Sequence, residues 1–228
     1  MAVRRERVWP IHLGLGALLL VAMPFAWHSW SFGVAGLARD LDEPTHLFRA
    51  GAWLSNALIF LHMLGGAAIT VLAPLQVLPV LRTRAPALHR ASGYLLAGLA
   101  VLTALAGLAY IPLRGTVGGP WMDVAFAGYG ALLLLAAVQA PRMARARDFS
   151  AHRAWALRLF VLAMGSLIYR LHYAVWYLAT DGLASAPDFS GAFDRVTLFA
   201  FYLPYLAALE LWLRLRPAPP PQPAGARA

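Results

Sequence analysis

The sequence contains no cysteine and no lysine, and only 10 of its 228 residues are acidic. The absence of cysteine excludes disulfide bonds, thiolate metal sites and the covalent attachment of c-type haem. The sequence also lacks a His-Glu-x-x-His segment, a nucleophile elbow and a phosphate-binding loop, so nothing in it resembles a hydrolase.

Charged residues are also scarce, at 13% of the chain, whereas hydrophobic residues make up 61% and the mean hydropathy is +0.63. Such a chain is too apolar to bury its hydrophobic surface in one soluble core, so we expect an integral membrane protein in contact with the lipid bilayer. A membrane helix needs about 20 apolar residues. This length predicts six spans, at residues 8–30, 52–80, 89–113, 120–140, 151–179 and 194–215.

Arginine supplies all 19 basic residues, and its positions alternate between the two sides of the predicted membrane. Most arginines precede the first span, follow the last one or lie in or next to the inner turns at 81–88 and 141–150, whereas four lie on the other side: Arg39, Arg49, Arg114 and Arg195. The positive-inside rule then places both termini in the cytoplasm, in the inner membrane of a bacterium. The net charge of +9 is thereby explained by topology, and nucleic acid is not expected as a partner.

The predicted fold is an all-α polytopic membrane protein with a central up-and-down four-helix bundle. We expect residues 1–51 to form a first, retained span and an outer loop, and residues 52–179 to form the bundle. Residues 180–215 would then hold a second outer loop and the sixth span, packed outside the bundle with the first one. The proline-rich segment 216–228 is expected to be a disordered cytoplasmic tail.

A register of polar residues recurs at an offset of 63 positions. Five residues and their counterparts take part: Gln76, Arg82, Arg84, His89 and Arg90 match Gln139, Arg145, Arg147, His152 and Arg153. So many polar identities at one spacing indicate a duplicated helical hairpin, and a parallel duplication in a membrane places equivalent residues at one depth. His89 and His152 should therefore form a symmetric pair on diagonal helices, facing each other across the bundle axis.

Two facing imidazoles are the axial ligands that a six-coordinate haem b requires, so His89 and His152 are the predicted metal ligands. Arg90 and Arg153 would suit the haem propionates, because guanidinium groups match carboxylates in a two-point manner. A stripe of small residues follows His89 at helical spacing: Gly93, Ala97, Ala100, Ala104 and Gly107. This stripe would admit either a flat macrocycle or a neighbouring helix, and a His-Arg pair at a helix start can also be an interfacial anchor.

Other polar residues lie deeper in the predicted spans. His62 precedes Gln76 by fourteen positions, so both should point the same way, toward the interior. We therefore include His62, Gln76 and Gln139 among the candidate cofactor-binding residues. His172 should point away from the axis that His152 faces, with a lateral approach to His62 as an alternative. Unpaired charges are costly in hydrocarbon, so two ion pairs are expected: Arg158 with Glu210, and Arg170 with Asp123.

These residues resemble a bacterial membrane family, domain of unknown function 2306 (DUF2306). The likeness covers residues 52–179 and rests on His62 with Gly65, on Gln76 near the end of its span, and on two later segments, His89-Arg90-Ala91-Ser92-Gly93 and His152-Arg153-Ala154-Trp155. The chain is also distantly similar to the cytochrome b561 and ferric-reductase-like bundles, which carry haem b between histidines on membrane helices. Those bundles usually have two histidine pairs, whereas this chain has one, so the resemblance implies a single haem.

The sequence thus predicts a haem b-binding electron-transfer protein whose partner is quinone or a redox protein, as a component of a membrane oxidoreductase if it is an enzyme at all. One alternative is a small-solute transporter or permease, in which His62, Gln76 and Gln139 contact the solute or carry protons. Another is a non-catalytic assembly or sensor subunit whose arginine-rich face binds a soluble partner or anionic lipid.

Overall fold

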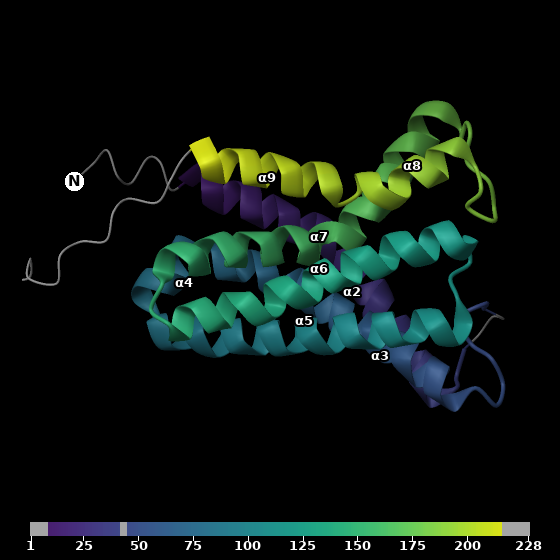
Figure 1. Cartoon of the computed structure of the whole chain (residues 1–228), viewed down its shortest axis with the longest axis horizontal. Coiled ribbons are helices and arrows are strands. Elements are labelled where there is room, and N and C mark those ends of the chain that lie inside the picture. The colour runs from purple at the N-terminus through teal and green to yellow at the C-terminus, as the bar shows by residue number, and fades with distance from the viewer. Residues whose placement is uncertain (1–8, 42–44, 216–228) are drawn as a thin grey trace, which may run out of the picture.

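The structure, a computed structural model, describes residues 9–41 and 45–215, and every regular element in those ranges is a helix. Six helical stretches are long and apolar enough to cross a membrane, which confirms the predicted fold class (Figure 1). In chain order the helices are α2 (Trp9–Ala38), α3 (Trp53–Val77), α4 (Pro79–Arg84), α5 (Pro86–Arg114), α6 (Gly119–Arg145), α7 (Phe149–Thr180), α8 (Ala192–Ala200) and α9 (Leu203–Leu215).

Four of these helices form the expected closed bundle. Helix α3 packs against α5, α5 against α6, α6 against α7, and α7 against α3. Helices α5 and α7, which carry the two repeated histidines, therefore lie on diagonal corners, as the short connections predict. Helix α2 packs outside this ring against α3, whereas α8 and α9 pack against α6 and α7 (Figure 1).

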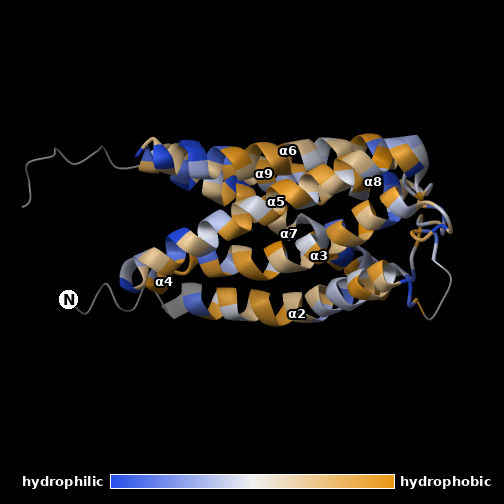
Figure 2. Ribbon diagram, turned by 90° about the horizontal axis from the view of Figure 1, so that it is seen from below, coloured by the Kyte–Doolittle hydropathy of each residue, from blue (hydrophilic) through white to orange (hydrophobic). Residues whose placement is uncertain are grey.

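The core of the bundle is built largely from alanine and leucine. Ala100, Ala136 and Ala163 are buried, each on a different helix, and small side chains let neighbouring helices approach closely. Leu96, Leu133 and Leu159 fill the space between them. Hydrophobic residues also cover the outside along the length of the helices, while hydrophilic residues gather toward the ends (Figure 2), as expected of helices surrounded by lipid.

Several predicted helix boundaries were wrong. Helix α2 continues to Ala38 rather than ending near residue 30, because the sequence stays apolar beyond Trp30. Helix α6 includes Pro141 and ends only at Arg145, and α7 begins at Phe149. The turn therefore comprises residues 146–148 rather than the predicted 141–150. Proline is tolerated inside membrane helices because neighbouring groups satisfy the freed carbonyl.

The sixth span is divided into two helices, α8 and α9, by a turn at Phe201 and Tyr202. Both aromatic rings are buried and pack on Tyr129 of α6, with ring centroids 5.0 and 5.6 Å away. Pro204 follows at the second position of α9, where its missing N–H leaves no intrahelical bond unmade. The aromatic contacts and the proline together account for a bend that hydropathy alone does not indicate.

The two hairpins close differently at the end of the bundle that holds the repeated histidines. In the first copy, α3 ends at Val77, Leu78 is extended with φ −61° and ψ 119°, and Pro79 starts the short helix α4. In the second copy, the equivalent chain continues as one helix to Arg145. Within the described residues this end also carries most of the arginines, and we call it the arginine-rich end: Arg82, Arg84, Arg90, Arg142, Arg145, Arg147, Arg153 and Arg214.

The opposite end carries Arg39, Arg49, Arg114 and Arg195. The separation of arginines between the two ends agrees with the alternation read from the sequence. Which end faces the cytoplasm remains a prediction, as do the boundaries of the four segments. The tail 216–228 and the loop residues Asp42 and Glu43 lie outside the described residues.

Candidate functional site

His89 and His152 occupy equivalent positions at the starts of α5 and α7. Each is the fourth residue of its helix, and its backbone N–H donates to the carbonyl of the residue before the helix, at 2.9 Å in both cases. Asp148 caps α7 by accepting from the backbone N–H of Ala151 at 3.0 Å. This bond and one from Ser150 stabilise the carboxylate and hold the pKa of Asp148 below its usual value. The duplication is therefore preserved in the helix register.

The His152 side chain is fixed by the neighbouring helix. Its Nδ1 lies 2.8 Å from the carbonyl oxygen of Ala140 in α6. Because a carbonyl can only accept, Nδ1 must carry the proton and the lone pair lies on Nε2. Metal-binding histidines are commonly oriented in this way, with one ring nitrogen donating to a carbonyl and the other left for the ligand.

The His89 side chain has no such anchor. Its Nδ1 is buried and has no hydrogen-bond partner. In the second copy, His152 bonds to the carbonyl of Ala140, which lies within α6. The repeat equivalent of Ala140 is Val77, the last residue of α3 before the break at Leu78. The helix that supplies the carbonyl in the second copy therefore does not continue in the first. A buried ring nitrogen without a partner costs about 1–3 kcal/mol, and this cost makes His89 the strongest indication of a ligand in the bundle.

The two histidines share one electrostatic environment. His89 lies within electrostatic range of His152, Arg82 and Arg90. This agrees with the placement of α5 and α7 on diagonal corners, and the two arginines add positive charge near His89. Arg82 was not among the candidate residues, although its place in the repeated register was the signal that could have identified it.

The two glutamines differ in their partners. Gln76 donates from Nε2 to Ser92 Oγ in α5 at 2.7 Å. The repeat equivalent of Ser92 is Trp155, which offers no hydroxyl, and Gln139 Oε1 is buried without a partner. Ser92 lies inside the segment that follows His89, and a polar residue in an apolar helix was the signal for its role.

The small-residue stripe on α5 packs against a neighbouring helix, which is one of the two alternatives that the sequence left open. A Cβ atom on Gly93 would lie 3.2 Å from Gln76 Oε1, and one on Gly107 would lie 2.8 Å from His62 Nδ1. Side chains of α3 therefore already occupy the space beside both glycines. A Cβ atom on Gly65 of α3 would overlap the hydroxyl group of Thr103 in α5, which explains why a glycine follows His62 by one turn.

His62 connects α3 to α5. Its Nδ1 donates to the carbonyl oxygen of Thr103 at 2.8 Å, and Gly107 leaves room for the ring. The prediction that His62 and Gln76 point the same way is confirmed, since both side chains bond to α5. Both point into a helix interface, and the hydrogen bond of His62 accounts for its presence within the membrane without a ligand.

Replacing His62 by alanine is expected to lower the free energy of unfolding by about 1 kcal/mol, because interhelical hydrogen bonds within membranes contribute about 0.6–1.7 kcal/mol. The change can be followed as a denaturant midpoint in detergent micelles. His28→Ala is the matched control, since His28 is exposed on α2 and only stacks on Phe32 of the same helix. Equal stability of the two variants would contradict the structural role of His62.

The arginines next to the histidines point outward. Arg90 is exposed. Arg153 is also exposed and lies over the ring of Trp212 in α9, with its guanidinium carbon 5.0 Å from the ring centroid. Arg153 is thus directed away from α5, and its predicted role at a propionate disagrees with this orientation. Its stacking instead attaches α9 to α7.

One of the two predicted ion pairs is present. Arg158 donates to both carboxylate oxygens of Glu210 at 2.6 and 2.9 Å, which joins α7 to α9. Arg170 bonds to Ser166 instead of Asp123, and Asp123 accepts from the backbone of Thr116, so the second pair was wrong. Among the described residues, Arg158–Glu210 is the only side-chain ion pair.

His172 points away from the bundle axis, as its angular position predicts. Its Nε2 lies 2.9 Å from the hydroxyl oxygen of Tyr205 in α9, so the alternative approach to His62 is not made. The described part of the chain contains no group of three or more histidine, aspartate or glutamate side chains that could hold a metal ion. The site that remains is the diagonal pair of His89 and His152 with Gln139 in the same repeated register, and we call these three residues the histidine layer.

Comparison with known proteins identifies the family but no activity. No curated protein and no solved structure matches the chain, so the likeness to cytochrome b561 receives no support from this source. The model of one family, described as "Predicted membrane protein (DUF2306)", matches residues 59–213. This match covers more than half of the sequence and includes all three residues of the histidine layer. The chain therefore belongs to the DUF2306 family of predicted membrane proteins.

Proposed function

We propose that the histidine layer binds haem b and that the protein transfers electrons in the cytoplasmic membrane, with quinone or a redox protein as its partner. The observation that carries the proposal is the buried Nδ1 of His89, which has no hydrogen-bond partner and lies within electrostatic range of His152. A ligand that pairs with this nitrogen would remove the cost of leaving it unsatisfied.

The donor set fits this cofactor. His152 would ligate through Nε2, because Nδ1 is held by Ala140, and His89 would supply the second imidazole. Arg82 and Arg90, both exposed at the arginine-rich end and within electrostatic range of His89, are better placed than Arg153 to neutralise propionates. When bound, the haem would supply one-electron redox chemistry. The residues of this chain would orient the ligands and balance the charge.

The depth of the site supports an exchange of electrons at one end of the bundle. Leu96 and Leu159, two turns deeper than the histidines on the same helices, are buried in the apolar core. This core separates the histidine layer from the opposite half of the bundle, where His62 and His172 bond to Thr103 and Tyr205 rather than to each other. A single haem near the arginine-rich end is therefore the version that the residues support.

The experiment is the absorption spectrum of protein purified from haem-replete cells. We expect a Soret band and a reduced α band, both lost in His89→Ala and in His152→Ala, because each variant removes an axial ligand. His62→Ala and His28→Ala should keep both bands, since neither side chain belongs to the histidine layer. A colourless wild-type protein, or bands that survive both ligand substitutions, would overturn the proposal.

The transporter alternative loses its main support in the structure. His62 and Gln76, proposed as solute contacts or proton carriers, are both held by hydrogen bonds to α5. The assembly or sensor alternative is favoured by one observation, the exposure of Arg82, Arg84 and Arg142 at the arginine-rich end. Co-purification of a colourless protein with an acidic partner through these arginines would support that function in place of electron transfer.

A further inference from the structure

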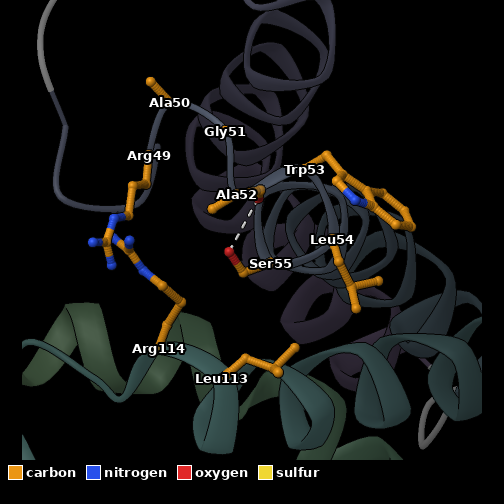
Figure 3. A pocket seen from close by; sticks show the side chains of 9 residues that line it. All are labelled: Arg49, Ala50, Gly51, Ala52, Trp53, Leu54, Ser55, Leu113 and Arg114. Atoms are coloured by element: carbon orange, nitrogen blue, oxygen red, sulfur yellow. Dashed lines mark hydrogen bonds between the residues drawn. The ribbon is translucent and has the colours of Figure 1, made fainter.

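A pocket of about 380 Å³ lies at the end of the bundle opposite the histidine layer. It is formed where the loop before α3 and the first turn of α3 meet the last turn of α5 (Figure 3). Arg49 and Arg114 line its polar side, and both side chains extend into it (Figure 3). The pocket was not indicated by the sequence, because its two arginines are far apart in the chain and were read only as topology signals.

The two arginines concentrate positive charge in this pocket. Arg114 donates from Nη2 to the carbonyl oxygen of His46 at 2.8 Å, which places its guanidinium group beside the loop that carries Arg49. Neither arginine forms an ion pair with a carboxylate of the described residues. Two guanidinium groups that share a pocket repel each other, and an anion between them would remove this repulsion and accept their hydrogen bonds.

The loop that carries Arg49 is rigidly held. Asn56, which is only 9% exposed, accepts from the backbone N–H of Arg49 at 3.0 Å and donates to its carbonyl oxygen at 2.8 Å. The N–H of Ala52 donates to the same carbonyl at 3.1 Å. Gly51, with φ +80°, permits the tight return of the chain into α3. The position of Arg49 is therefore built into the fold.

The rest of the pocket is apolar and faces outward. Trp53 is 70% exposed and Leu113 is 52% exposed, and Leu54 lies on the same side of the pocket as Trp53 (Figure 3). Tryptophan is typical of the boundary between headgroups and acyl chains. A site with two arginines on one side and lipid-facing apolar residues on the other matches a molecule with an anionic head and a hydrocarbon tail. A free anion would make no contact with the apolar residues of the pocket.

We propose that this pocket binds the phosphate of an anionic phospholipid, with Arg49 and Arg114 on the headgroup and Trp53 and Leu113 against the glycerol and upper acyl chain. The proposal is independent of the haem proposal, since it concerns the opposite end of the bundle. Bound lipid would hold the loop before α3 against α5.

The test measures binding of phosphatidylglycerol to the full chain in detergent by native mass spectrometry, with inorganic phosphate as a second probe. An arginine close to the anionic headgroup contributes about 1 kcal/mol, or about fivefold, to lipid binding. We therefore expect Arg49→Gln to weaken phosphatidylglycerol binding about fivefold. The double variant with Arg114→Gln should weaken it about 25-fold if the two contributions are independent.

Arg195→Gln is the matched control, because Arg195 is an exposed arginine at the same end of the bundle but outside the pocket. It should leave lipid binding unchanged. Arg49→Gln should keep the wild-type denaturant midpoint in lipid-free micelles, since Asn56 holds the backbone of residue 49 rather than its side chain. Equal binding by Arg49→Gln and Arg195→Gln would overturn the proposal, and so would inorganic phosphate that competes fully with phosphatidylglycerol.

Discussion

Replacing Gly36 by leucine is expected to lower the free energy of unfolding by about 3 kcal/mol, at the upper end of the cost of inserting bulk into a packed interface. Gly36 lies where α2 meets α3, and a Cβ atom there would overlap the ring of Phe60. Phe60 is fully buried, so its ring has little freedom to move aside. Leucine at this position should push α2 away from the bundle.

The matched control is Gly14→Leu, in the same helix. A Cβ atom on Gly14 would have no other atom within 4 Å, so the added side chain enters open space. The measurement is the denaturant midpoint in micelles, together with protease sensitivity of the loop between α2 and α3. If both leucine variants are equally stable, α2 does not pack on α3 through this contact.

Replacing Glu210 by alanine is expected to cost about 2.5 kcal/mol, because it leaves the Arg158 guanidinium group without a partner within a membrane span. The pair joins α7 to α9 through two short hydrogen bonds. Arg158 also lies over the Trp155 ring, 4.6 Å from its centroid, so the charge has little opportunity to reach water at the membrane surface without losing this contact as well.

A double-mutant cycle with Arg158→Ala separates the pair from other effects of the substitutions. The loss of unfolding free energy in the double variant should be smaller than the sum of the two single losses, since the double variant leaves no unpaired charge. Arg195→Ala, which removes an exposed arginine, is the control for loss of charge alone. Strictly additive losses would show that the two side chains do not stabilise each other.

The sequence predicted the parts of the fold that depend on periodicity. The repeat at an offset of 63 residues placed His89 and His152 at equivalent helix positions, and the short connections placed their helices on diagonal corners. Both predictions are confirmed because a duplicated hairpin repeats its register along with its residues. The pairing of Arg158 with Glu210 followed from similar depth in neighbouring spans.

Features that depend on individual tertiary contacts could not be predicted. Pro79 starts a new helix after a break in the chain, whereas Pro141 lies within a continuous helix, and the two prolines look alike in sequence. The stripe after His89 was compatible with a macrocycle or a helix, and only the positions of Gln76 and His62 identify the helix. The orientation of Arg153 is set by Trp212, which the sequence does not mark as its neighbour.

The helix break at Leu78 gives the two copies of the hairpin different freedom. His152 cannot rotate without losing its bond to Ala140, whereas His89 can reorient without breaking any bond at Nδ1. A molecule that enters between the two rings would therefore be accommodated by rearrangement of the first copy alone. His152 in the second copy would keep its position, so the two copies of the hairpin would differ in rigidity although they arose by duplication.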